Sequence, residues 1–104
     1  MAFTREFKET VLELCNGSEY RKALLIESLQ TYLNGDVVAG NTLLRNYLNG
    51  TQSFSEVAKE IGVLEPSLRR MLSPNGNARV RNFFPIIKVC LERENLNSFD
   101  LLVH

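Results

Sequence analysis

The sequence predicts an all-α fold of five to six short helices that contains a helix-turn-helix. Apolar residues recur at steps of three or four along most of the chain, which is typical of amphipathic helices. Asn-Gly pairs at 16–17, 34–35 and 49–50 divide the first half into segments, because this pair favours a left-handed helix end. A length of 104 residues suits one core. We therefore expect a single domain over residues 1–104.

Residues 1–50 are predicted to form an N-terminal helical part of three helices with short connections. The first helix covers residues 4–15, the second begins after a Ser18 cap, and the third covers residues 37–48 after an Asp36 cap. Each is expected to end in a left-handed conformation at the Asn-Gly pair that follows it. The apolar stripes consist of Phe3, Phe7, Val11 and Leu14 in the first helix, Tyr20, Leu24, Leu25, Leu29, Tyr32 and Leu33 in the second, and Val37, Leu44, Tyr47 and Leu48 in the third.

Two shorter helices are predicted after Gly50. Ser53 is expected to cap a helix over residues 54–61, with Glu56 at the reciprocal position of a capping box. Gly62 ends this helix, and a further helix runs from about Pro66 to Leu72. Proline suits the first helical turn because its missing N–H is not needed there.

The remainder of the chain is predicted to contain a loop, a helix and a short strand. Residues 73–77 are rich in turn-forming types. If Asn82 caps the last helix, Pro85 falls in the first turn and does not disturb it. In the segment from Ser98 to Val103, apolar and polar residues alternate in part, and the segment is expected to form a short strand. Because one strand needs a partner, the same segment of a second subunit is the simplest choice, which predicts a homodimer.

Residues 53–73 have the spacing of a helix-turn-helix. Ala58 is the small residue required where two short helices cross, and Gly62, four residues later, allows the positive φ of a sharp turn. An apolar residue, Leu68, follows after six more positions. The residues expected to fill the wedge between the two helices are Ile61, Leu64, Leu68 and Met71. The same spacing is also compatible with a scaffold that binds no DNA.

The charges are distributed unevenly along the chain. The formal net charge is zero, but residues 66–91 contain five Lys/Arg and no acidic residue, whereas residues 1–65 contain six Lys/Arg and nine acidic residues. Attraction to phosphate depends on the local potential, so a basic block of this kind can bind a duplex despite zero net charge. The alternative is a solvated basic face that the acidic half balances.

The second helix of such a motif enters the major groove, where Arg reads guanine O6 and N7. We expect Arg69 and Arg70 to contact bases or adjacent phosphates, and the loop that follows to contact the sugar-phosphate backbone. The residues predicted to bind DNA are Ser53, Ser67, Arg69, Arg70, Asn77, Arg79 and Arg81. Glu65 opposes binding unless it accepts from cytosine N4. Its alternative role is to favour the helix N-terminus through the helix dipole.

Several stretches resemble a known family, the small bacterial Xre-type helix-turn-helix regulators known as addiction-module antidotes or HigA-like antitoxins. The stretches are REFKETV at 5–11, RKALL at 21–25, YLNGDVVAGNTLLRNYLNGT at 32–51, SLRRMLSPNGN at 67–77 and RVRNFFPII at 79–87. The resemblance implies a dimeric DNA-binding protein that represses its own operon, in which a RelE-like toxin is also encoded. The chain has Ala78 where the family usually has Pro, and Glu65-Pro66 where the family has a basic residue.

Other classes of protein find little support in the sequence. No enzyme, metal or cofactor site is expected: the single His is His104, and no nucleophile has a general base in a recognisable context. The acidic N-terminus and the absence of a long apolar run predict a cytoplasmic protein without a membrane segment. Cys15 and Cys90 are expected to be buried free thiols. The alternative function is a protein-interaction module that binds a basic partner, with the helix-turn-helix as scaffold.

Overall fold

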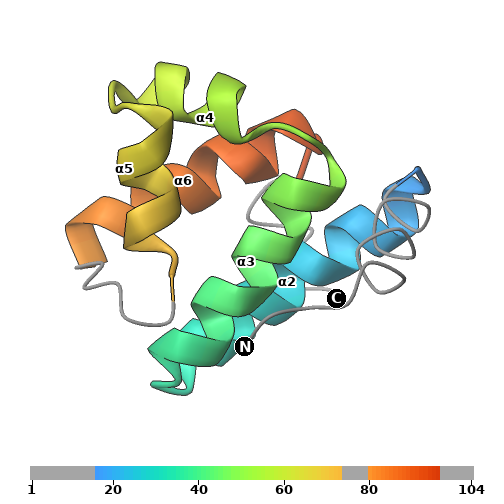
Figure 1. Cartoon of the computed structure of the whole chain (residues 1–104). Helices are drawn as coiled ribbons and strands as arrows, with labels where there is room; N and C mark the ends of the chain where they lie inside the picture. Colours follow the sequence, from blue (N-terminus) through green and yellow to red (C-terminus); the bar gives the residue numbers. More distant parts are fainter. Residues whose placement is uncertain (1–15, 74–79, 97–104) are drawn as a thin grey trace, which may run out of the picture.

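The computed structural model describes residues 16–73 and 80–96, which form five helices and no strand (Figure 1). The predicted all-α class is therefore confirmed. The helices are α2 (Ser18–Leu33), α3 (Val37–Gly50), α4 (Phe54–Ile61), α5 (Glu65–Met71) and α6 (Val80–Arg93). The predicted helix at 4–15 and the predicted strand at 98–103 lie outside the described residues. No described helix is both long enough and apolar enough to cross a bilayer.

Helices α2 and α3 pack side by side as an antiparallel pair (Figure 1). The turn between them has the predicted chemistry: Gly35 adopts a φ of +88°, and the Asp36 carboxylate accepts from the Ala39 N–H at 3.1 Å. The helices meet closely at Gly40, where a Cβ atom would lie only 2.6 Å from the Tyr32 ring. The absence of a side chain at Gly40 therefore allows this close approach.

Two of the predicted helix ends are wrong. Gly17 is extended (φ −92°, ψ 130°) and precedes α2, so that Ser18 is the first helical residue and not the cap. Helix α3 continues through Gly50, and the positive φ falls on Gln52. The reason is that Thr51 N–H and Oγ1 both donate to the Tyr47 carbonyl, at 3.0 and 2.8 Å, which prolongs the helical hydrogen bonding past the Asn-Gly pair.

Helix α6 also differs from the prediction. It begins at Val80, before the expected Asn82 cap, and Pro85 lies inside it. An internal proline removes a backbone donor and costs about 3 kcal/mol or more. Ile86 and Ile87 are both buried directly after it, and burial of each contributes about 1.5–3 kcal/mol. Packing against the core therefore offsets the cost of the proline.

The core receives side chains from all five described helices. Its buried apolar members are Leu24, Leu25 and Tyr32 from α2, Leu44, Tyr47 and Leu48 from α3, Phe54, Val57 and Ala58 from α4, Leu68 from α5, Leu72 after it, and Ile86, Ile87 and Cys90 from α6. The predicted burial of the Cys90 thiol is confirmed. Cys15 lies outside the described residues.

Three buried groups that can lose a proton at high pH, one thiol and two tyrosine hydroxyls, make the fold sensitive to alkaline pH. Burial raises the pKa of the Cys90 thiol to about 12, from an ordinary 9.0. Burial also raises the pKa of the Tyr32 and Tyr47 hydroxyls well above 10.0, and at Tyr47 the hydrogen bond to Glu94 adds to the effect. Each group keeps its proton in the folded state at a pH where the unfolded chain loses it. Their contribution to stability is therefore complete below about pH 9 and is lost progressively as the pH rises above the ordinary pKa of each group.

We expect Tyr32 and Tyr47 to ionise only as the protein unfolds. The chain has three tyrosines, so the tyrosinate absorbance of two of them should rise together with the loss of helical circular dichroism during an alkaline titration. The variant Tyr32→Phe should reduce the unfolding-linked absorbance to that of one tyrosine. Ionisation of all three tyrosines before any loss of helix would contradict the prediction.

Candidate nucleic-acid interface

Helices α4 and α5 form the predicted helix-turn-helix and cross steeply in Figure 1. Gly62 adopts a φ of +79° between them. Its N–H donates to the Lys59 carbonyl at 3.2 Å, and the Val63 N–H donates to the Ala58 carbonyl at 3.0 Å. These two bonds are a Schellman motif, which satisfies the last carbonyls of α4 and reverses the chain. The role predicted for Gly62 is therefore confirmed.

The wedge between the two helices contains most, but not all, of the predicted residues. Ala58 and Leu68 are buried, and Ile61 and Met71 are partly buried against the core to which both belong. Leu64 is 75% exposed, so its predicted burial is wrong. It precedes α5 in an extended conformation, which directs its side chain out of the wedge.

Val63 packs against the core in the position that was predicted for Leu64. The sequence does contain a signal for this arrangement. In a Schellman motif, the residue after the left-handed glycine commonly makes an apolar contact with the preceding helix. Val63 is that residue, so the turn type alone would have favoured its burial over that of Leu64.

The outer face of α5 carries three of the predicted DNA-binding residues. Arg69 and Arg70 are exposed and Ser67 is half-buried, whereas Leu68 between them is fully buried. Pro66 and Arg70, four residues apart, lie on the side of the helix opposite Leu68. No acidic side chain of the described residues forms an ion pair with Arg70. The positive charge of Arg70 therefore faces solvent.

Arg69 makes several contacts within the protein. Its Nη2 and Nε atoms lie 2.9 and 3.2 Å from Oε1 of Glu65, one helical turn away. Its Nη1 lies 3.4 Å from Oδ1 of Asn49, and its guanidinium carbon lies 4.0 Å from the centroid of the Phe54 ring. The guanidinium is therefore directed back from α5 over the start of α4.

Ser53 does not belong to the exposed surface. It is 1% exposed, its hydroxyl lies 2.6 Å from that of Thr51, and its N–H donates to the Leu48 carbonyl at 3.0 Å. Its ψ of 10° lies outside the β region typical of a cap, and its side chain forms no cap hydrogen bond. The predicted capping box is therefore wrong, and the Ser53 hydroxyl is buried in this conformation rather than exposed to a ligand. Glu56 instead accepts from Arg93 Nη2 at 2.6 Å.

The other predicted residues are not placed by the structure. Asn77 and Arg79 lie outside the described residues. Arg81 lies in α6, but its side chain is not among those described. The structure thus brings together Ser67, Arg69 and Arg70 on α5, whereas Ser53 is buried before the start of α4.

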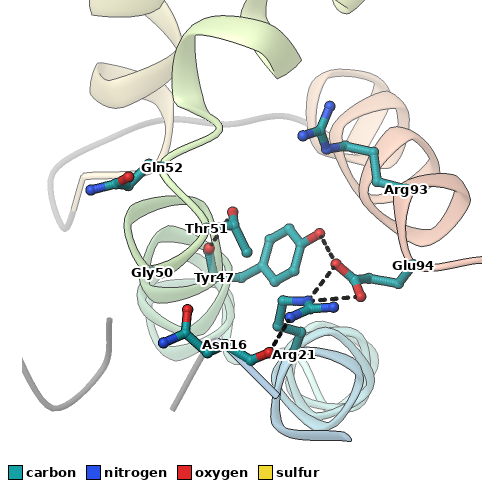
Figure 2. Close-up of a pocket in the computed structure, with 8 residues that line it drawn as sticks. All are labelled: Asn16, Arg21, Tyr47, Gly50, Thr51, Gln52, Arg93 and Glu94. Atoms are coloured by element: carbon teal, nitrogen blue, oxygen red, sulfur yellow. Dashed lines mark hydrogen bonds and ion pairs between the residues drawn. The ribbon is translucent and has the colours of Figure 1, made fainter. Parts of the chain in front are cut away.

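A pocket of about 580 Å³ lies apart from these residues, where the ends of α2, α3 and α6 meet (Figure 2). It is lined by Asn16, Arg21, Tyr47, Gly50, Thr51, Gln52, Arg93 and Glu94. Figure 2 shows Arg21 and Tyr47 converging on the Glu94 carboxylate. Arg21 Nε lies 3.0 and 3.1 Å from its two oxygens, and the Tyr47 hydroxyl donates to Oε2 at 2.7 Å.

This charged cluster satisfies its own members, so we interpret it as a structural link among three helices. Glu94 is only 8% exposed, and the described part of the chain has no buried side-chain polar atom without a hydrogen-bond partner. Sequence reasoning missed the cluster because its members are far apart in the chain and share no motif. Within the described ranges, no group of three or more His, Cys, Asp or Glu side chains could hold a metal ion.

Comparison with known proteins provides no relative from which a site could be transferred. No protein-family model, curated protein or solved structure matches the chain.

Proposed function

We propose that the protein is a sequence-specific DNA-binding transcriptional regulator that reads duplex DNA with α5. The observation that carries this proposal is the position of Arg70. Its charge faces solvent on the outer side of a short helix, while Leu68 anchors the inner side in the core. An α-helix with its side chains is about 10–12 Å in diameter and fits the major groove, which is about 12 Å wide.

The chemistry of the exposed side chains supports this function. A guanidinium donates two parallel hydrogen bonds to guanine O6 and N7, the commonest specific contact in the major groove. Arg70 has no competing carboxylate among the described side chains. The Schellman turn at Gly62 fixes α5 relative to α4, so α4 can lie across the backbone while α5 enters the groove.

The resemblance to HigA-like antitoxins supports a more specific role. We infer on that basis that the protein represses its own operon as a homodimer and binds a RelE-like toxin encoded beside it. Binding of the toxin would use a surface other than the outer face of α5 if repression and neutralisation occur together. A pull-down with the product of the neighbouring gene tests this role separately from DNA binding.

Arg70→Ala should weaken binding to the native operator by about 1–3 kcal/mol, which is the usual contribution of one bidentate contact to a base. Fluorescence anisotropy with the DNA upstream of the gene, and with a shuffled duplex, measures the loss. The discrimination between the two duplexes should fall with the affinity. Arg45→Ala in α3 is the matched control, because it removes the same charge from a helix outside the motif.

Unchanged discrimination by Arg70→Ala would contradict the proposed readout by α5. If neither duplex binds, or if binding does not weaken with salt, the protein is not a DNA-binding regulator, because neutralised phosphates always make affinity depend on salt. The protein-interaction module would then be the better explanation.

A further inference from the structure

The two arginines of α5 differ in their electrostatic surroundings. Arg69 pairs with Glu65 at 2.9 Å, whereas Arg70 pairs with no acidic residue of the described chain. Glu65 is the first residue of α5, at the end of the helix that would enter the groove first. One of the two cations on this helix is thus offset by a carboxylate from the same helix.

The contacts of Arg69 favour one position of its side chain. An exposed ion pair four residues apart is weak when it stands alone, because both side chains lose rotamer freedom. Here Glu65 acts together with Asn49 and with the face of the Phe54 ring. Phe54 is buried, so its ring is a fixed platform for the guanidinium. The three contacts together hold the Arg69 guanidinium towards the start of α4.

We propose that Glu65 limits non-specific DNA binding by neutralising Arg69 and holding its guanidinium over Phe54. This inference rests on the proposed function. A phosphate that approaches Arg69 must compete with the Glu65 carboxylate for the guanidinium. Non-specific binding consists almost entirely of phosphate contacts, whereas specific binding also includes base contacts such as those proposed for Arg70. Glu65 therefore opposes the non-specific complex more strongly, and it determines specificity by penalising the wrong DNA.

The variant Glu65→Gln tests the inference, because glutamine keeps the shape and the acceptor oxygen but removes the charge. Affinity for a shuffled duplex should rise about three- to tenfold at low salt, and the slope of log K against log[salt] should steepen by up to about 0.9, the value for one additional phosphate. Affinity for the native operator should rise less, so discrimination should fall. Glu27→Gln is the matched control, because Glu27 is exposed on α2 and the change in net charge is the same.

Arg69→Gln, alone and combined with Glu65→Gln, shows whether the effect passes through Arg69. In the Arg69→Gln background, Glu65→Gln should change the affinity for the shuffled duplex by less than about twofold, because no cation remains to be released. Circular dichroism melting of each variant checks that it is folded.

Three results would overturn the inference. The first is an unchanged or lower affinity of Glu65→Gln for the shuffled duplex. The second is an equal increase with and without Arg69, which would mean that Glu65 acts on the DNA directly. The third is an absence of salt-dependent binding in every variant, including the wild type. Only the third result also refutes the proposed function. Failure of the inference about Glu65 can therefore be distinguished from failure of the proposed function.

Discussion

Replacing Leu68 with alanine should lower the free energy of unfolding by about 2–5 kcal/mol, the range observed when a buried leucine loses its side chain. Leu68 is 0% exposed and is the core residue contributed by the middle of α5. Alanine removes its apolar contacts and leaves a cavity in the core. Urea unfolding followed by circular dichroism measures the change.

Leu64→Ala is the matched control for this substitution. The same atoms are removed four residues earlier in the chain, but Leu64 is 75% exposed. The expected change is within about 0.5 kcal/mol, as for most surface substitutions. Equal destabilisation by the two variants would mean that Leu64, and not only Leu68, lies in the wedge between α4 and α5.

The second large effect is expected from Glu94→Ala, which should cost about 2–4 kcal/mol. The Glu94 carboxylate accepts from Arg21 and from the buried hydroxyl of Tyr47. Alanine leaves that hydroxyl without its acceptor and removes the counter-charge of a partly buried guanidinium, and both losses carry a desolvation cost. Arg21 also donates to the Asn16 carbonyl at 3.1 Å, so the cost should stay below that of a fully isolated buried charge.

Two further substitutions show whether the effect of Glu94→Ala is specific. Glu92→Ala removes an exposed carboxylate whose only ion pair among the described residues is with Lys88 at 4.0 Å, and it should change stability by less than about 0.5 kcal/mol. Glu94→Gln keeps an acceptor for Tyr47 and should be milder than Glu94→Ala. A stability of Glu94→Ala close to that of the wild type would contradict the role of the cluster.

The existence of the helices could be predicted from the sequence, but several of their ends could not. Apolar residues recur at helical spacing because one face of each helix is buried. The buried positions Leu44, Leu48 and Leu68 follow this spacing. The Asn-Gly rule is a local preference, and it failed at Gly50 because hydrogen bonds of Thr51 and burial of Tyr47 continue the helix. Tertiary packing thus decides where a helix ends when it conflicts with a local signal.

The candidate site, like the fold, could be predicted from the sequence only in part. The spacing of Ala58, Gly62 and Leu68 correctly identified the crossing and the turn. The ion pair between Glu65 and Arg69 follows the four-residue spacing of a helix, so sequence reasoning alone could have included it. The contact of Arg69 with Phe54 could not be predicted in this way, because it depends on the angle at which α4 and α5 cross.

The end of α6 has a consequence for how motion spreads through the molecule. Two adjacent residues there connect to different parts of the fold: Arg93 to Glu56 of α4, and Glu94 to Arg21 of α2 and Tyr47 of α3. Fraying of this single turn would release both connections at once. The helix pairs α2–α3 and α4–α5 are therefore linked at this turn as well as through the shared core, and should open as one cooperative unit. A partner that binds near the end of α6 would then influence α4 and α5, the helices of the proposed DNA-binding surface, without touching them.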